Sequence, residues 1–241
     1  MTILERLNRR YLQQLFRTPE GRAHVLAQAA DGEASGESAI FDRLLARVDD
    51  PDLQRVIDKH RQDELRHERM FRERLAAQCA RWELPEELRL VPRIDREAGG
   101  VIDRPIRTDR DVLAAYSFLQ ALEERAVFSF GLFIAALAGP DPKSAAVFAE
   151  VLEDERRHLK YCAAVAKRYA RDEAERLAVL QHMRSAEARA FQANQMANMS
   201  FTLGRGWVGG PLETAVWRVV RAAAMAFPHA PLRGLGRPLA A

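Results

Sequence analysis

The amino-acid sequence predicts an all-α protein, and three observations support this prediction. Segments rich in Ala, Leu, Arg, Glu and Gln and poor in Gly and Pro run from about residue 1 to 80 and from about residue 111 to 200, which favours long helices. No stretch alternates apolar and polar residues between turn residues, so a sheet has no obvious source. With 241 residues, of which 48% are hydrophobic, the chain can bury one sizeable core.

The N-terminal part of the chain predicts a short helix followed by an antiparallel pair of helices. The short helix covers about residues 3–16. A Thr-Pro pair begins the next helix, over about residues 19–48, because proline is favoured in the first helical turn. An Asp-Pro pair, with Asp50 as N-cap, begins a third helix over about residues 51–79.

The second part predicts another pair of helices, separated from the first pair by a long connection. Residues 82–110 contain Leu-Pro, Val-Pro, Gly-Gly and Arg-Pro pairs, which predict an irregular segment. Helices are expected over about residues 111–138 and 142–170, and Asp141 repeats the start signal of Asp50. Two helical hairpins joined by one long crossover form an antiparallel four-helix bundle.

Two further helices are expected after these hairpins. A fifth helix covers about residues 172–199, and a short helix covers about residues 211–227 after a glycine-rich joint. We therefore expect a helical bundle domain over residues 1–200, with its core at residues 22–170, and a C-terminal extension over residues 201–241.

Composition excludes several classes of protein. The net charge of +3 is small for this length, and Asp and Glu offset the basic residues along the helices, so nucleic-acid binding is not indicated. Cys79 and Cys162 form no Cys-x-x-Cys pair, which argues against a rubredoxin-type iron centre and a zinc ribbon. The N-terminus has no secretory signal pattern, and with two separate cysteines this predicts a cytoplasmic protein.

A duplicated motif carries the chemistry. Residues 63–67 read Asp-Glu-Leu-Arg-His and residues 154–158 read Asp-Glu-Arg-Arg-His. Glutamate and histidine three residues apart share one helix face, so each copy can offer a carboxylate oxygen and an imidazole nitrogen to one metal ion. One such pair occurs readily by chance, but two copies of the same Asp-Glu-x-Arg-His pattern do not.

The two copies also sit at matching heights. Glu64 follows the N-cap Asp50 at the same spacing as Glu155 follows the N-cap Asp141. At about 1.5 Å of rise per residue, both glutamates lie roughly 21 Å from the turn of their hairpin. A partner on the preceding helix should therefore lie at a similar distance before that helix ends.

Two glutamates satisfy this spacing. Glu33 and Glu123 stand at the same distance from the expected ends of their helices, Val48 and Ala138, and this distance matches the height of the motifs. Glu37, one helical turn further along, is the alternative to Glu33. Glu124 is the alternative to Glu123, although Glu123 shares an apolar stripe with residues such as Phe130. A carboxylate inside an apolar stripe needs a partner, and a metal ion is a suitable one.

This constellation resembles the ferritin-like di-iron carboxylate superfamily, which includes ferritins and rubrerythrins, over about residues 22–168. The duplicated Asp-Glu-x-Arg-His form is similar to that of bacterial di-iron oxygenases. The resemblance implies a ferritin-like bundle that binds two iron ions, with manganese or a mixed Fe/Mn pair as alternatives. The implied metal ligands are Glu33, Glu64, His67, Glu123, Glu155 and His158. Asp63 and Asp154 would orient the opposite histidine ring, and Arg66 and Arg157 would hold these aspartates.

Other candidates have structural interpretations. His60, one turn before Glu64, is expected to be partly exposed, with support of the metal site as the alternative. Cys162 and Tyr116 are expected to be packed in the core, with the lining of an oxidant pocket as the alternative for Tyr116. The short C-terminal helix places Leu212, Val216 and other apolar residues on one face. This face should pack on the bundle or on a partner in a homodimer, with an anionic membrane surface as the alternative.

These features predict a di-metal oxidase or oxygenase that uses dioxygen or peroxide on a small organic substrate, with an external electron donor. The alternative is a non-catalytic metal-binding or iron-handling protein with ferroxidase-type turnover only. An enzyme should have an apolar cavity that reaches the metals, lined by residues such as Ile40, Phe130 and Phe133. An iron-handling protein should instead have an acidic entry path.

Overall fold

The computed structural model describes residues 3–34, 37–78 and 82–226, and every regular element in this part of the chain is helical. The α-helices and one 3₁₀ helix, η1, follow the chain as α1 (Ile3–Leu15), α2 (Pro19–Ala34), α3 (Glu37–Arg47), α4 (Pro51–Ala76), η1 (Glu86–Leu88), α5 (Val91–Ala98), α6 (Asp109–Leu137), α7 (Pro142–Tyr169), α8 (Glu173–Gly204) and α9 (Pro211–Ala226).

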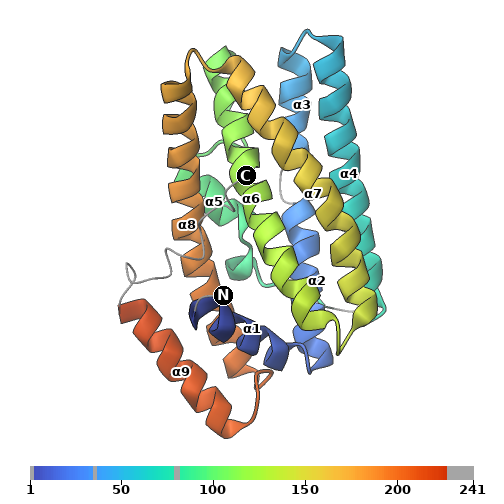
Figure 1. Ribbon diagram of the computed structural model, residues 1–241, viewed down its shortest axis with the longest axis vertical. Coiled ribbons are helices and arrows are strands. Elements are labelled where there is room, and N and C mark those ends of the chain that lie inside the picture. Colours follow the sequence, from blue (N-terminus) through green and yellow to red (C-terminus); the bar gives the residue numbers. More distant parts are fainter. Residues whose placement is uncertain (1–2, 35–36, 79–81, 227–241) are drawn as a thin grey trace.

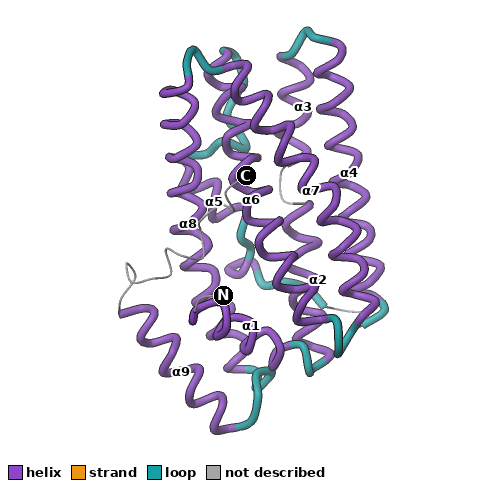
Figure 2. The backbone as a smooth tube through the Cα atoms, in the orientation of Figure 1, coloured by secondary structure: helices purple, strands orange, loops and turns teal. Residues whose placement is uncertain are grey.

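The long helices pack side by side as an elongated bundle (Figure 1). Helices α2 and α4 pack against each other, as do α6 and α7, and α4 also contacts α7. Helix α8 lies along the outside of α6, and α5 packs against α8 (Figures 1 and 2). The predicted all-α class and the antiparallel packing of long helices are therefore confirmed.

The helix-start signals act as predicted. The Asp50 side chain accepts hydrogen bonds from the backbone amides of Asp52 and Leu53 at 2.9 and 3.2 Å, and Pro51 begins α4. The Asp141 side chain accepts from the amide of Ser144 at 3.2 Å, and Pro142 begins α7. These caps satisfy amides that have no partner inside the helix. They also fix Asp50 and Asp141 as the residues from which the position of each Asp-Glu-x-Arg-His motif along its helix is counted.

The helix predicted over residues 19–48 is seen as α2 and α3, and residues 35–36 between them lie outside the described residues.

The prediction that residues 82–110 form an irregular segment is wrong, because this connection contains η1 and α5. Val91, Ile94 and Ala98 are buried on one face of α5, and Gly99 ends the helix with φ 86°. An apolar face this short does not stand out between proline and glycine signals.

Buried apolar side chains form two clusters. One cluster contains Phe71 on α4 and Phe130 on α6, and the other contains Ile57 on α4 and Leu119 on α6. Along α4, buried polar residues occupy the helical turns between Ile57 and Phe71. The same order holds on α6, where Glu123 lies between Leu119 and Phe130. A polar layer is thus enclosed between two apolar layers.

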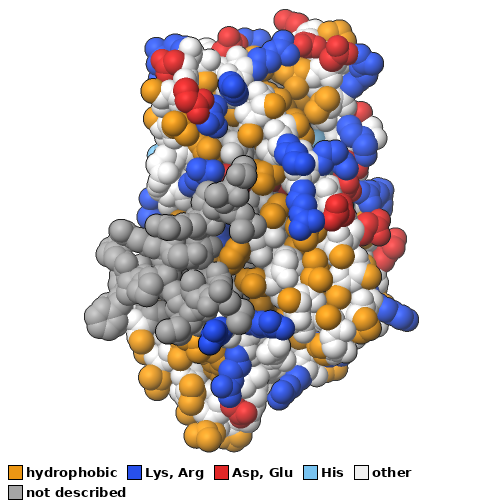
Figure 3. Space-filling model, viewed as in Figure 1, with side chains coloured by type: hydrophobic (Ala, Val, Ile, Leu, Met, Phe, Trp, Pro, Cys, Tyr) orange, Lys and Arg blue, Asp and Glu red, His pale blue; other side chains and the backbone are white. Residues whose placement is uncertain are grey.

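Helix α9 packs on the rest of the chain through Trp217 and through Val220 of the predicted apolar face, while packing of this face on a homodimer partner stays a prediction. Trp217 is buried, and its indole nitrogen donates a hydrogen bond to Gln14 Oε1 at 2.5 Å. Leu212, Val216 and Val219, on the predicted packing face, are 78%, 54% and 70% exposed. In Figure 3 hydrophobic side chains gather at the end of the molecule where α9 lies.

No helix in the described part of the chain is both long and apolar enough to cross a membrane.

The two caps should differ in their contribution to stability. Asp141 is buried and also pairs with Arg74 of α4 at 2.7 Å, whereas Asp50 is partly exposed and pairs with the exposed Arg168. We expect Asp141→Ala to lower the free energy of unfolding by about 2 kcal/mol or more, because it removes a cap and leaves buried partners unpaired. Asp50→Ala, the matched control, should cost less. Urea unfolding of both variants measures this, and equal losses would contradict it.

Candidate metal centre

Two groups of buried carboxylates and imidazoles meet in the polar layer. The first consists of Glu33, Glu64, His67 and Glu155, and the second of His60, Glu64, Glu123 and His158. Within each group the potential ligand atoms lie within 4.8 Å of one another. The structure therefore brings together all six side chains that the resemblance implied, on α2, α4, α6 and α7, and it adds His60.

The first group is built around His67. Its Nδ1 atom lies 3.4 Å from Glu33 Oε2, 3.2 Å from Glu155 Oε1 and 3.9 Å from Glu64 Oε2. His67 and Glu64 come from neighbouring turns of α4, while Glu33 and Glu155 come from α2 and α7. Three carboxylates and one imidazole converge on one position.

The second group is built around two histidines. His158 Nδ1 lies 3.1 Å from Glu64 Oε1 and 3.8 Å from Glu123 Oε1. His60 Nε2 approaches the same two oxygens at 2.9 and 3.0 Å. Glu155 Oε2 also lies 3.2 Å from His158 Nδ1. The carboxylates of Glu64 and Glu155 therefore face both groups, so they could bridge two ions.

The centre is buried, and its polar atoms face one another. The exposed fractions of the six implied ligand residues range from 0% for His67 to 8% for Glu33. His60 Nε2 and Glu64 Oε1 lie 2.9 Å apart, and His67 Nδ1 and Glu155 Oε1 lie 3.2 Å apart, but none of these four atoms makes a hydrogen bond of normal geometry. Buried polar atoms without well-formed hydrogen bonds are costly. All four face the positions where the groups converge, an arrangement that would suit metal binding.

The outward side of each histidine meets an aspartate of the opposite motif. His67 Nε2 lies 3.2 Å from Asp154 Oδ2, and His158 Nε2 lies 3.4 Å from Asp63 Oδ2. These are the contacts expected from the duplicated motif. Each leaves Nδ1 of the histidine directed at the carboxylates, with its tautomer set by the aspartate.

Arginines hold both aspartates. Arg157 donates to Asp63 at 2.9 Å and also pairs with Asp154 at 2.6 Å. Arg66 donates to Asp154. Asp63 is buried and Asp154 nearly so, whereas Arg66 is partly exposed and Arg157 is exposed. The four residues form a network between α4 and α7, which differs from an isolated surface ion pair.

Protonation compensates for the crowded carboxylates. Burial would lower the pKa of His158, but contacts with Glu155 and Glu64 raise it to about 10. Burial and the neighbouring Glu155 carboxylate raise the pKa of Glu123 well above its ordinary value. Burial lowers the pKa of His60, which favours a neutral imidazole. These shifts favour the protonated forms of His158 and Glu123, whose protons offset part of the carboxylate charge.

His60 is the residue whose environment was predicted wrongly. It is 1% exposed rather than partly exposed. Its Nδ1 atom contacts the hydroxyl of Tyr161, and its ring stacks near that of His158 with centroids 3.8 Å apart. The positions of His60, Glu64 and His67 at i, i+4 and i+7 place them on one helix face. This spacing was the available signal.

Of the two alternative glutamates, Glu124 and Glu37, the structure describes the side chain of Glu124 alone. Glu124 pairs with Arg184 of α8 at 2.5 Å and belongs to neither group. The Glu37 side chain lies outside the described residues, and so does Cys79. Cys162 and Tyr116 are buried in the core, as expected.

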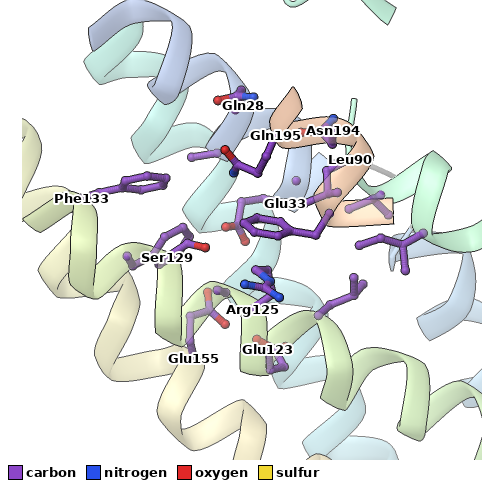
Figure 4. A pocket seen from close by; sticks show the side chains of 18 of the residues that line it. Gln28, Glu33, Leu90, Glu123, Arg125, Ser129, Phe133, Glu155, Asn194 and Gln195 are labelled. Atoms are coloured by element: carbon purple, nitrogen blue, oxygen red, sulfur yellow. The ribbon is translucent and has the colours of Figure 1, made fainter. Parts of the chain in front are cut away.

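A cavity of about 140 Å³ adjoins the centre. Its lining includes the carboxylates of Glu33, Glu64, Glu123 and Glu155, and its remaining walls are mostly apolar. Figure 4 shows Glu123 and Glu155 at one end of this cavity and Phe133 along its side. Phe130 and Phe133 line the cavity as expected. Ile40 does not, because it is buried in the other apolar cluster.

Comparisons with known proteins assign no family to this chain. No protein-family model matches it. No significant match was found among curated proteins or among solved structures. What the buried centre does has to be inferred from the chemistry and geometry of its own residues.

Proposed function

We propose that this protein is a ferritin-like di-metal carboxylate protein that acts as an oxidase or oxygenase on a small organic substrate. The observation that carries the proposal is the pair of converging groups of buried ligand atoms, which share Glu64. Side chains from α2, α4, α6 and α7 contribute. One Glu from each of two helices and a Glu-x-x-His from each of the other two is the arrangement of di-metal sites in such bundles.

The donor set favours iron. Four carboxylates with two or three imidazoles suit Fe(II), Fe(III) or Mn(II) better than zinc, which prefers four-coordinate sites rich in nitrogen and sulfur. The four carboxylates of Glu33, Glu64, Glu123 and Glu155 balance the charge of two divalent cations. Iron is therefore the expected metal, with manganese or a mixed pair as alternatives.

The residues of the chain have separate roles in this proposal. When bound, two iron ions supply the ability to reduce dioxygen or peroxide and to oxidise a molecule held beside them. The glutamates and histidines hold the ions, and Asp63 and Asp154 keep the imidazoles oriented and basic. The apolar side chains of the cavity walls offer few hydrogen-bonding groups to water on the side where a substrate would lie. An external electron donor would supply reducing equivalents.

The cavity distinguishes the two candidate functions. An iron-handling protein needs a polar, acidic route for the incoming cation. The space beside the carboxylates is instead lined by side chains such as Leu122, Phe130 and Phe133. This supports an enzyme with an organic substrate over an iron-handling protein with ferroxidase turnover only.

The first test is metal content. After anaerobic reconstitution with Fe(II), elemental analysis should find close to two ions per chain. His67→Ala or His158→Ala should remove most of the metal, because each deletes a ligand. His182→Ala, a matched control at an exposed position of α8, should retain wild-type content. Reconstituted wild-type protein without bound metal would overturn the proposal.

The role of His60 can be tested separately. If its Nε2 atom binds the ion held by the second group, His60→Ala should lower the metal content toward one ion per chain. Tyr161→Phe removes the hydroxyl that contacts the other ring nitrogen but no ligand, so it should keep both ions. A His60→Ala protein with two ions at wild-type affinity would mean that His60 only supports Glu64 and Glu123.

The aspartates should tune the centre without being ligands. Asp63→Asn and Asp154→Asn weaken the contact to the opposite histidine, so each should reduce metal affinity or turnover by about 10 to 100-fold while the fold is kept. Asp58→Asn is the control, because Asp58 pairs with Arg61 away from the histidines. Competition with a chelator measures affinity. Wild-type affinity and turnover in both variants would show that these aspartates form ion pairs only.

A further inference from the structure

The cavity beside the carboxylates has walls from several elements besides the four helices that carry the implied ligands. Leu88 of η1, Ile94 of α5 and Phe191 of α8 line it. Phe130 and Phe133 of α6 complete the apolar surface. These side chains come together only because α5 and α8 pack against each other and against the bundle.

Cavity size limits the occupant. A cavity of roughly 150 Å³ with aliphatic and aromatic walls can hold benzene, and this one measures about 140 Å³. Three phenylalanines, Phe130, Phe133 and Phe191, offer faces and edges to a ring. The space therefore fits one six-membered ring or an aliphatic group of similar size.

The charges of the lining residues also limit which ligands the cavity can bind. Apart from the four glutamates, the one charged lining residue among those described is Arg125. Glu187 of α8 accepts from Arg125 Nε at 2.6 Å and from Nη2 at 3.0 Å. The guanidinium also lies over the ring of Phe191, 3.7 Å from its centroid. With two divalent ions on the carboxylates and Glu187 on Arg125, the cavity carries no net charge, which disfavours an ionic ligand.

The end of the cavity away from Glu123 and Glu155 is polar but uncharged. Figure 4 shows Gln28, Gln195 and Asn194 there. Gln28 Nε2 donates to Asn198 Oδ1 at 2.7 Å, and Asn194 Nδ2 donates to the carbonyl of Leu88 at 2.8 Å. Amides held in this way can offer hydrogen bonds to one polar group of a ligand without desolvating a charge.

We propose that the cavity binds a neutral, mostly apolar molecule of single-ring size, with one hydrogen-bonding group at the amide end and its apolar part beside the carboxylates. Its role as the substrate rests on the proposed function, whereas its binding does not require turnover. Amines and carboxylic acids that are ionised at neutral pH are excluded as preferred ligands.

The test measures binding of three probes to Fe(II)-loaded protein under anaerobic conditions, by calorimetry. Benzyl alcohol is neutral and has one hydroxyl, toluene lacks the hydroxyl, and benzoate is anionic. We expect benzyl alcohol to bind at least as tightly as toluene and at least tenfold more tightly than benzoate. Metal content is measured on the same samples.

Two glycines provide a matched pair of variants. Gly32 of α2 lines the cavity, Gly131 of α6 is exposed, and a Cβ at either position would have no neighbour within 4 Å. Gly32→Leu should weaken benzyl alcohol binding at least tenfold by filling the cavity, and Gly131→Leu should leave it within twofold. Both substitutions favour helix, so both proteins should fold. Ala126→Leu, at a second lining position, should repeat the effect of Gly32→Leu.

The outcomes separate this inference from the proposed function. Benzoate binding as tightly as benzyl alcohol, absence of benzyl alcohol binding to protein that contains metal, or equal affinities in the two glycine variants would each overturn the inference and leave the metal centre standing. Probe binding that is lost in Gly32→Leu, in protein that takes up no metal, would support the cavity and overturn the proposed function.

Discussion

The burial of four glutamate carboxylates in one layer of a helical bundle is the constraint on which the rest of the structure depends. Glu33, Glu64, Glu123 and Glu155 are all buried and lie near one another. Like charges at such distances repel, and each buried carboxylate costs several kcal/mol if it lacks a partner. The raised pKa values of His67, His158 and Glu123 favour their protonated forms, which offset most of this charge. Metal ions would replace these protons, so folding and metal binding are coupled.

The aspartate–histidine contacts between α4 and α7 are reciprocal because the motif is duplicated in the sequence. Both helices begin at an Asp-Pro pair, and both carry the motif at the same distance from it. When the helices pack, the aspartate of each motif therefore reaches the histidine of the other. The duplicated Asp-Glu-x-Arg-His motif therefore supplies both the candidate ligands and the aspartates that orient the histidines. An insertion of one residue before either motif would rotate it by about 100° and disrupt both contacts.

The parts of the centre that follow from helical periodicity could be predicted, and the parts that depend on tertiary packing could not. Spacing from the N-caps placed Glu64 and Glu155 at one height, and spacing from the expected helix end placed Glu123 at the same height. The environment of His60 was missed because its burial depends on Phe41 of α3 and Tyr161 of α7, which pack around its ring. Local sequence could not place Ile40 either, since the cluster that buries it is chosen by how α3 packs against α4.

The two sides of the centre consequently serve different purposes. On the side of α4 and α7, charged pairs fix the imidazoles. On the side of α6, Arg125 follows Glu123 by two positions and lines the same cavity, where it pairs with Glu187 of α8. One helix thus carries both a carboxylate of the centre and the ion pair that holds α8 in place as a cavity wall. Changes on α8 can reshape the cavity without touching a ligand residue, so the molecule admitted can vary independently of the metals.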